Sequence, residues 1–203
     1  MKKLTLFILF LLPLIGVAQV DTAAVIKETE AFQQELNKEY KDKSTSPLLL
    51  GDLKKFKQHD FFSIDARYAV VAHLTLTPDA PYVLLPTTGS RASEERSFAI
   101  AHFELNGKQC ALTLYQSKTL RELPEYSDYL FLPFTDETTG NESYGGGRYL
   151  DIRIPKEGNV LIINFNKAYN PYCAYNHKYS CPLVPATNSL PVAIKAGVRF
   201  EGK

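Results

Sequence analysis

The alternation of hydrophobic and polar positions separates a helical N-terminal segment from a long remainder of short extended runs. Apolar residues recur at near-helical spacing within residues 21–43: Val25, Ile26, Phe32, Leu36 and Tyr40. This spacing predicts one amphipathic helix, with Asp21 as its N-cap and an end before Pro47. Beyond Pro47 the pattern predicts strands over residues 67–77, 82–85, 97–105, 108–116, 129–134, 148–154, 160–166 and 192–200.

The strongest local signal is the dipeptide Asn106-Gly107, which separates two alternating runs. An Asn-Gly pair favours the two-residue turn of a tight hairpin, because both residues tolerate a positive φ. This turn fixes the register and places Phe103 opposite Cys110. One face of the hairpin is then apolar, and Cys110 is predicted to be a core residue.

A second hairpin is predicted from residues 148–154 and 160–166, which flank the turn sequence PKEGN. This pairing sets Arg148 opposite Asn166 and brings the loops that flank the hairpin to one end of the sheet. No internal repeat or linker is visible, so residues 19–203 are predicted to form a single domain. The predicted fold is mainly β: an antiparallel curled sheet or barrel-like fold with an N-terminal amphipathic helix.

The first residues have the pattern of a secretory signal peptide, predicted to span residues 1–18. Lys2 and Lys3 precede the apolar run Leu4–Ile15, and small residues follow it. A retained membrane anchor is the alternative, but the run is interrupted by Pro13 and is short for a span of about 20 residues. The mature protein is therefore predicted to be periplasmic or secreted, with no stable membrane insertion after cleavage.

The charge balance argues against a nucleic-acid partner. The chain has 23 Lys and Arg against 22 Asp and Glu, and removing Lys2 and Lys3 leaves 21 against 22, a net charge of −1. A near-neutral protein lacks the basic field that attracts phosphate backbones or anionic membranes.

Two segments in the second half are dense in residue types that form binding sites: FTDETTGNESYGGGRYLDIRI (134–154) and NFNKAYNPYCAYNHKYSCPL (164–183). The predicted second hairpin lies between their richest parts and should bring them together. The ligand-binding candidates are Asp136, Glu142, Tyr144, Gly146, Arg148, Asn166, Tyr169, Asn170, Tyr172 and Tyr175. No residue among them is assigned a catalytic role.

Arg148 is the most informative of these candidates. It alternates with Leu150 and Ile152, so it should point toward the apolar face and pair with Asp136 or Glu142. The pair is interpreted either as a structural buried ion pair or as the polar base of a pocket for an anionic ligand. The preceding glycines 145–147 favour a tight bend over an anion-binding loop, because they precede a strand and match no phosphate-binding motif.

Three cysteines allow at most one intramolecular bridge. Cys173 and Cys181 share one loop of a predicted exported protein, so the favoured interpretation is a disulfide between them. A Cys173 nucleophile with His177 nearby is the functional alternative, although no known cysteine-hydrolase signature is present. Zinc is not predicted, because these residues lack the paired spacing of structural zinc sites.

The acidic loop that contains Asp136, Glu137, Asn141 and Glu142 carries oxygen ligands of the kind calcium prefers. Its spacing is not that of an EF-hand, and a turn-rich acidic loop is commonly solvated. The sequence therefore predicts no metal site and no cofactor.

Most of the chain resembles a bacterial and archaeal family, DUF1684. The runs that carry the resemblance are LPFTDETTGNESYGGGRYLD, FNKAYNPYCAYNHKYSCPLVPATNSLPVAIKAG and LPTTGSRASEERSFAIAHFELNG. The family is one of unknown function, so the resemblance implies no activity, cofactor or catalytic residue.

Two main functional hypotheses follow. The first is a β-rich module that binds a small-molecule or anionic ligand near Arg148 and the Tyr/Cys loop, the Tyr- and Cys-rich loop within residues 164–183. The second is a hydrolase at the same place that uses a carboxylate, Asp136 or Glu142, or the thiol of Cys173. A third is an interaction protein whose Tyr/Asn loop binds a protein partner.

Overall fold

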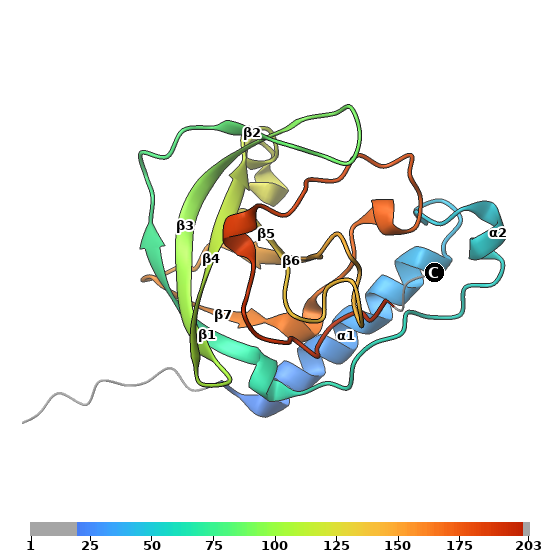
Figure 1. Cartoon of the computed structure of the whole chain (residues 1–203), viewed down its shortest axis with the longest axis horizontal. Coiled ribbons are helices and arrows are strands. Elements are labelled where there is room, and N and C mark those ends of the chain that lie inside the picture. The colour runs from blue at the N-terminus through green and yellow to red at the C-terminus, as the bar shows by residue number, and fades with distance from the viewer. Residues whose placement is uncertain (1–19, 201–203) are drawn as a thin grey trace, which may run out of the picture.

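The computed structural model describes residues 20–200, so the predicted signal peptide lies outside the described part of the chain. The fold is mainly β, with one antiparallel sheet curled into a half-barrel and few helices, which confirms the predicted fold class (Figure 1). The long helix is α1 (Thr22–Lys41), and α2 (Leu50–Leu53) is a single turn. Within residues 20–200 no helix is long and apolar enough to span a membrane.

The sheet has seven strands: β1 (Ala69–Leu76), β2 (Val83–Leu85), β3 (Ser93–Leu105), β4 (Lys108–Ser117), β5 (Tyr129–Phe134), β6 (Arg148–Arg153) and β7 (Val160–Asn164). The order is β6-β5-β4-β3-β1-β7, and β2 pairs with the start of β3. Short 3₁₀ turns precede the first strand, η1 (Ala66–Tyr68), and lie between β4 and β5, η2 (Leu120–Glu122) and η3 (Pro124–Tyr126). Three more follow β7: η4 (Phe165–Lys167), η5 (Tyr172–Ala174) and η6 (Ala186–Asn188).

The β3–β4 hairpin has the predicted turn and register. Asn106 and Gly107 both have a positive φ, 52° and 74°, as the two-residue turn requires. Phe103 lies opposite Cys110, and both side chains are buried in the core.

The predicted pairing of residues 148–154 with 160–166 is wrong. Strands β6 and β7 lie at the two ends of the sheet order, where β6 pairs with β5 and β7 pairs with β1. The curl of the sheet brings these two edges near each other without a ladder between them. Instead, a single antiparallel bridge joins Tyr149 in β6 to Tyr169 in the loop that follows β7.

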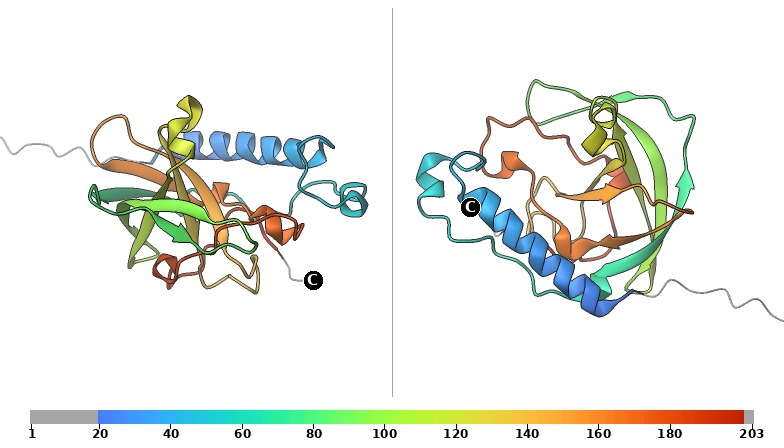
Figure 2. Two further views of the ribbon diagram at one scale, coloured as in Figure 1. Left: turned by 90° about the horizontal axis from the view of Figure 1, so that it is seen from above. Right: turned by 180° about the vertical axis from the view of Figure 1, so that it is seen from behind.

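Helix α1 lies across the outside of the curled sheet, over the gap between β6 and β7 (Figure 2). Asp21 caps the helix, as predicted, by accepting hydrogen bonds from the N–H groups of Ala23 and Ala24 at 2.9 and 3.2 Å. The amide of Asn164 donates to the buried Thr29 hydroxyl at 3.1 Å and ties the end of β7 to the helix.

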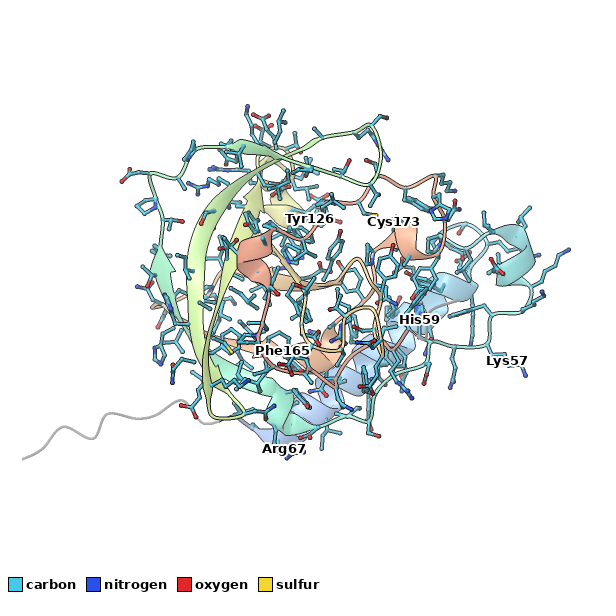
Figure 3. The ribbon with its side chains drawn as sticks, viewed as in Figure 1. Lys57, His59, Arg67, Tyr126, Phe165 and Cys173 are labelled. Atoms are coloured by element: carbon cyan, nitrogen blue, oxygen red, sulfur yellow. The ribbon has the colours of Figure 1, made fainter. Side chains whose placement is uncertain are left out.

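The main core fills the concave side of the sheet, and Phe165 points into it. Lys57 and Arg67 lie at the outside of the molecule and point outward (Figure 3). The strand predicted for residues 192–200 is not present, although Ile194 and Val198 are buried as core residues. The backbone of this segment bonds to separate partners instead of to one strand: Arg148 and Asp136 side chains reach Ile194 and Ala196, and loop backbone groups bond residues 192 and 197–200.

Candidate functional site

A cavity of about 370 Å³ lies on the face of β5 and β6 that points away from the main core. Helix α1 and the loop 169–182 cover it. Its lining residues are Phe32, Leu36, Glu39, Ser93, Glu95, Ser117, Leu120, Tyr129, Phe131, Tyr149, Asp151, Tyr169, Pro171, Tyr172, Cys181 and Pro182. Six of the sixteen lining residues are aromatic, and three are carboxylates.

Glu95 is the most buried of these carboxylates, with 4% of its surface exposed. The Ser93 hydroxyl donates to its Oε1 at 2.7 Å, whereas its Oε2 is buried and has no hydrogen-bond partner. Burial raises the pKa of Glu95, and the hydroxyls of Ser93 and Ser117 oppose that shift only in part. A buried acceptor without a partner is rare in folded proteins, so this carboxylate marks the cavity as unusual.

Asp151 lies at the exposed side of the cavity and accepts two phenolic hydrogen bonds on one oxygen. The hydroxyls of Tyr129 and Tyr169 donate to its Oδ1 at 2.8 and 2.7 Å. Burial and the nearby Asp151 carboxylate raise the phenol pKa of both tyrosines, so both stay protonated donors.

The other two tyrosine hydroxyls of the lining are also engaged. Tyr172 donates to Oε1 of Glu39 on α1, and Tyr149 donates to the carbonyl of Pro182. Burial raises the pKa of both phenols. These bonds fix the aromatic walls to the helix and to the loop.

The two residue-rich segments do lie side by side, but through a different contact from the one predicted. Tyr149 and Tyr169 exchange backbone hydrogen bonds of 2.9 and 3.0 Å. Of the ten ligand-binding candidates, Tyr169 and Tyr172 line the cavity, and the candidate disulfide residue Cys181 lines it as well.

Arg148 does not reach the cavity, which corrects the predicted anion anchor. It is fully buried and pairs with Asp136 at 2.7 Å, so the structural interpretation of the pair holds. The guanidinium also donates to the carbonyls of Ile194 and Ala196. The N–H of Ile194 in turn donates to Oδ1 of Asp136 at 3.3 Å, so the ion pair holds the backbone around residues 194–196.

Glu142, Tyr144 and Gly146 lie outside the cavity. Glu142 forms an exposed ion pair with Lys195 at 2.9 Å, and the Tyr144 ring packs against Phe200. A side chain at Gly146 would meet the Tyr144 ring at 2.5 Å. The glycines therefore form a tight bend, as favoured from the sequence.

Asn166, Asn170 and Tyr175 stabilise the loops behind the cavity. The buried Asn166 side chain bonds both the N–H and the carbonyl of Asp65 at 2.9 Å. Asn170 donates to the Tyr175 hydroxyl at 3.0 Å, and the Tyr175 ring packs on Tyr40. These side chains hold backbone and rings, and they do not face the cavity.

The predicted disulfide is not present. Cys110, Cys173 and Cys181 are all buried free thiols. Cys173 and Cys181 are neighbours, because the N–H of Cys173 donates to Sγ of Cys181 at 3.3 Å. Burial raises the pKa of Cys181 to about 11, so this thiol stays protonated at neutral pH.

The carboxylates of the cavity were missed from the sequence, Glu95 above all. Strict alternation would put Glu95 on the same face as the core residue Ala99. A bulge between Ser97 and Ala99 shifts the register and turns Glu95 to the cavity face, opposite Ser117. Asp151 was not among the candidates, because its alternation along the strand places it on the outer face, where a carboxylate is usually solvated. Its neighbour on that face, Arg153, pairs with Asp128 at 2.6 Å.

The described residues contain no group of three or more His, Cys, Asp or Glu side chains that would hold a metal ion. Glu39, Glu95 and Asp151 thus do not converge on one point. Their separate placement suits an extended ligand better than a single ion.

The chain belongs to the DUF1684 family, whose model, described as "Protein of unknown function (DUF1684)", matches residues 54–199. The chain is also similar to the solution NMR structure of an uncharacterized protein from gene locus rrnAC0354 of Haloarcula marismortui. The two share 31% identity with a TM-score of 0.69, and the match covers 88% of this chain and 96% of the other. The curated proteins contain no match to the chain. The predicted family is confirmed.

Proposed function

We propose that this protein is an exported small-molecule-binding module whose ligand occupies the cavity between α1, β5, β6 and the loop 169–182. The observation that carries the proposal is the buried Oε2 of Glu95, an acceptor without a partner in a cavity of about 370 Å³. A bound ligand that donates a hydrogen bond would satisfy this atom.

The cavity has the size and composition of a small-molecule site. Such sites typically have volumes of about 300–1,000 Å³ and combine aromatic walls with a few placed polar groups. Here rings such as Phe131 and Tyr149 supply the walls, and Glu95 and Asp151 supply the polar groups. The tyrosine hydrogen bonds hold these walls in place before a ligand arrives, which lowers the entropic cost of binding.

The alternative hydrolase loses the residues on which it was based. Asp136 is neutralised by Arg148 inside the core, and Glu142 is paired with Lys195 at the surface. The Cys173 thiol is buried. None of the three lines the cavity.

Export rests on the signal-peptide pattern of residues 1–18. The test is to express the full chain in a bacterial host, separate the compartments and measure the intact mass of the product. Loss of about 18 residues together with recovery outside the cytoplasm supports export, and an uncleaved cytoplasmic protein contradicts it.

Ligand binding is tested by screening a fragment library by saturation-transfer NMR and mapping the hits through amide chemical shifts. We expect the shifts to cluster at Ser93, Ser117 and Tyr149. A Leu120→Trp variant, which enlarges one lining side chain, should weaken the same hits. A library without hits, or hits that map elsewhere, contradicts the proposal.

A further inference from the structure

The cavity offers hydrogen-bond acceptors but almost no free donors. All four tyrosine hydroxyls of the lining donate to protein acceptors: two to Asp151, one to Glu39 and one to the Pro182 carbonyl. The Ser93 hydroxyl is committed to Oε1 of Glu95. What remains for a ligand is Oδ2 of Asp151, Oε2 of Glu39, the faces of the rings, and Oε2 of Glu95, which has no partner but is itself buried in the wall.

The charge of the lining is negative and is not compensated within it. Glu39, Glu95 and Asp151 line the cavity, and the lining contains no Lys, Arg or His. Within residues 20–200, no Lys, Arg or His lies within ion-pair distance of any of these three carboxylates. A ligand that carries positive charge would supply what the protein leaves out.

The aromatic walls suit the same class of ligand. Six rings line the cavity: Phe32, Tyr129, Phe131, Tyr149, Tyr169 and Tyr172. Ring faces attract organic cations, and the attraction strengthens where water is excluded. The carboxylates do not form a metal cluster, so the positive charge is expected on an organic group of some length.

We propose, on the basis of the binding function above, that the cavity selects a small aliphatic or aralkyl amine in its ammonium form. Its N–H groups donate to Oε2 of Glu95, and its apolar part packs between the rings. Sites for neutral polyols also combine carboxylates with aromatic rings. The hydroxyls of a polyol accept as well as donate hydrogen bonds, however, and this cavity has few free donors for them.

The experiment compares matched probes on the wild-type protein at about pH 8 by calorimetry or NMR titration. The probes are 2-phenylethylamine, 2-phenylethanol, phenylacetate and glucose. We expect the amine to bind at least about tenfold more tightly than the alcohol, and phenylacetate to bind most weakly, because one charge-assisted hydrogen bond is worth roughly that factor.

The variant Glu95→Gln keeps the size of the side chain and removes its charge. It should weaken the amine at least about fivefold and change the alcohol by less than about twofold. Glu104→Gln is the matched control, since Glu104 lies on the same strand, is exposed and does not line the cavity. The control should leave all four affinities unchanged.

The outcomes separate this inference from the proposed function. If the alcohol, phenylacetate or glucose binds at the cavity as tightly as the amine, the cavity is a binding site but the choice of an amine is wrong. If no probe and no library fragment binds, both proposals fail. Because the probe series uses wild-type protein, the inference stays testable even if Glu95→Gln does not fold.

Discussion

Two buried carboxylates of this protein, Asp136 and Glu95, have opposite surroundings. Asp136 accepts a hydrogen bond from Arg148 at 2.7 Å and from the N–H of Thr138 at 2.7 Å. Glu95 has the Ser93 hydroxyl on one oxygen and no partner on the other. Both are less than a tenth exposed, so burial alone does not distinguish them.

The difference indicates which cluster supports the fold and which is available to a ligand. We call the Arg148–Asp136 pair the closed cluster, because the guanidinium meets the carboxylate and the carbonyls of Ile194 and Ala196, and neither charge lacks a partner. Only the buried Nε of Arg148 has no hydrogen-bond partner. Around Glu95 the protein leaves an acceptor and a cavity. Buried polar groups that stay unsatisfied cost stability, and proteins commonly tolerate that cost at functional sites.

The largest expected effect is a loss of stability when the ion pair of the closed cluster is broken. Arg148→Met leaves the Asp136 carboxylate buried without a cation and removes the donors to residues 194 and 196. We expect a loss of about 3–5 kcal/mol in the free energy of unfolding, measured by chemical denaturation. The double variant Arg148→Met with Asp136→Leu should recover part of this loss, because no unpaired charge remains. A stable Arg148→Met protein that no longer binds its ligand would show instead that Arg148 serves binding and not the fold.

The next effect is a gain in stability, and it concerns Glu95 and the cavity around it. Burial raises the folded-state pKa of Glu95 above its value in the unfolded chain. The unfolded chain therefore ionises first as pH rises, so this group lowers stability at neutral pH and has no effect below its unfolded pKa. Glu95→Gln should stabilise the free protein by about 1–2 kcal/mol near pH 8.

This gain should disappear near pH 3, where a glutamate is protonated in the folded and the unfolded chain alike. The measurement is the difference in Tm between variant and wild type across pH, which removes the common contributions of Glu39, Asp151, Cys181 and the four lining tyrosines. A gain that is equal at both pH values would show that charge burial is not its cause.

A smaller loss of stability is expected from a substitution at the exposed side of the cavity. Tyr169→Phe removes one of the two hydroxyls that donate to Asp151, and Tyr129 retains the other. We expect a loss of about 1 kcal/mol in stability and a change of less than about twofold in amine affinity, since the carboxylate keeps its charge. Loss of amine binding would mean that Asp151, rather than Glu95, anchors the ligand.

The smallest effect tests a site far from both clusters. Gly107 has a φ of 74°, and a Cβ there would meet no atom within 4 Å. Gly107→Ala should therefore cost only the backbone strain, about 1 kcal/mol or less, and leave ligand affinity unchanged. A binding defect in this variant would show that the assay responds to stability rather than to the cavity.

Sequence reasoning worked best where the determinants are local. The turn at Asn106-Gly107 fixes its own hairpin, and Asp21 caps its own helix, so both could be predicted from neighbouring residues. The inward orientation of Arg148 also followed, because alternation along β6 is regular, and of the two predicted carboxylate partners, Asp136 and Glu142, the structure shows Asp136.

The rest depends on long-range geometry that the pattern does not contain. Strands β6 and β7 pair with β5 and β1 rather than with each other, which only the curl of the whole sheet decides. The bulge at Ser97/Ala99 turns Glu95 toward the cavity and breaks the alternation on which a face assignment relies. The pattern of residues 192–200 predicts a strand, yet its backbone bonds to the side chains of Arg148 and Asp136 and to several loops instead of to one neighbouring strand.

Helix α1 lies before residue 54, where the match to the family begins, and yet it provides Phe32, Leu36 and Glu39 to the wall of the cavity. A chimaera that exchanges residues 22–41 with those of another family member would thus alter the shape and charge of one wall while the sheet stays the same. Under the proposed function, exchange of this one segment is expected to change which compound the cavity selects, while the half-barrel sheet keeps its sequence.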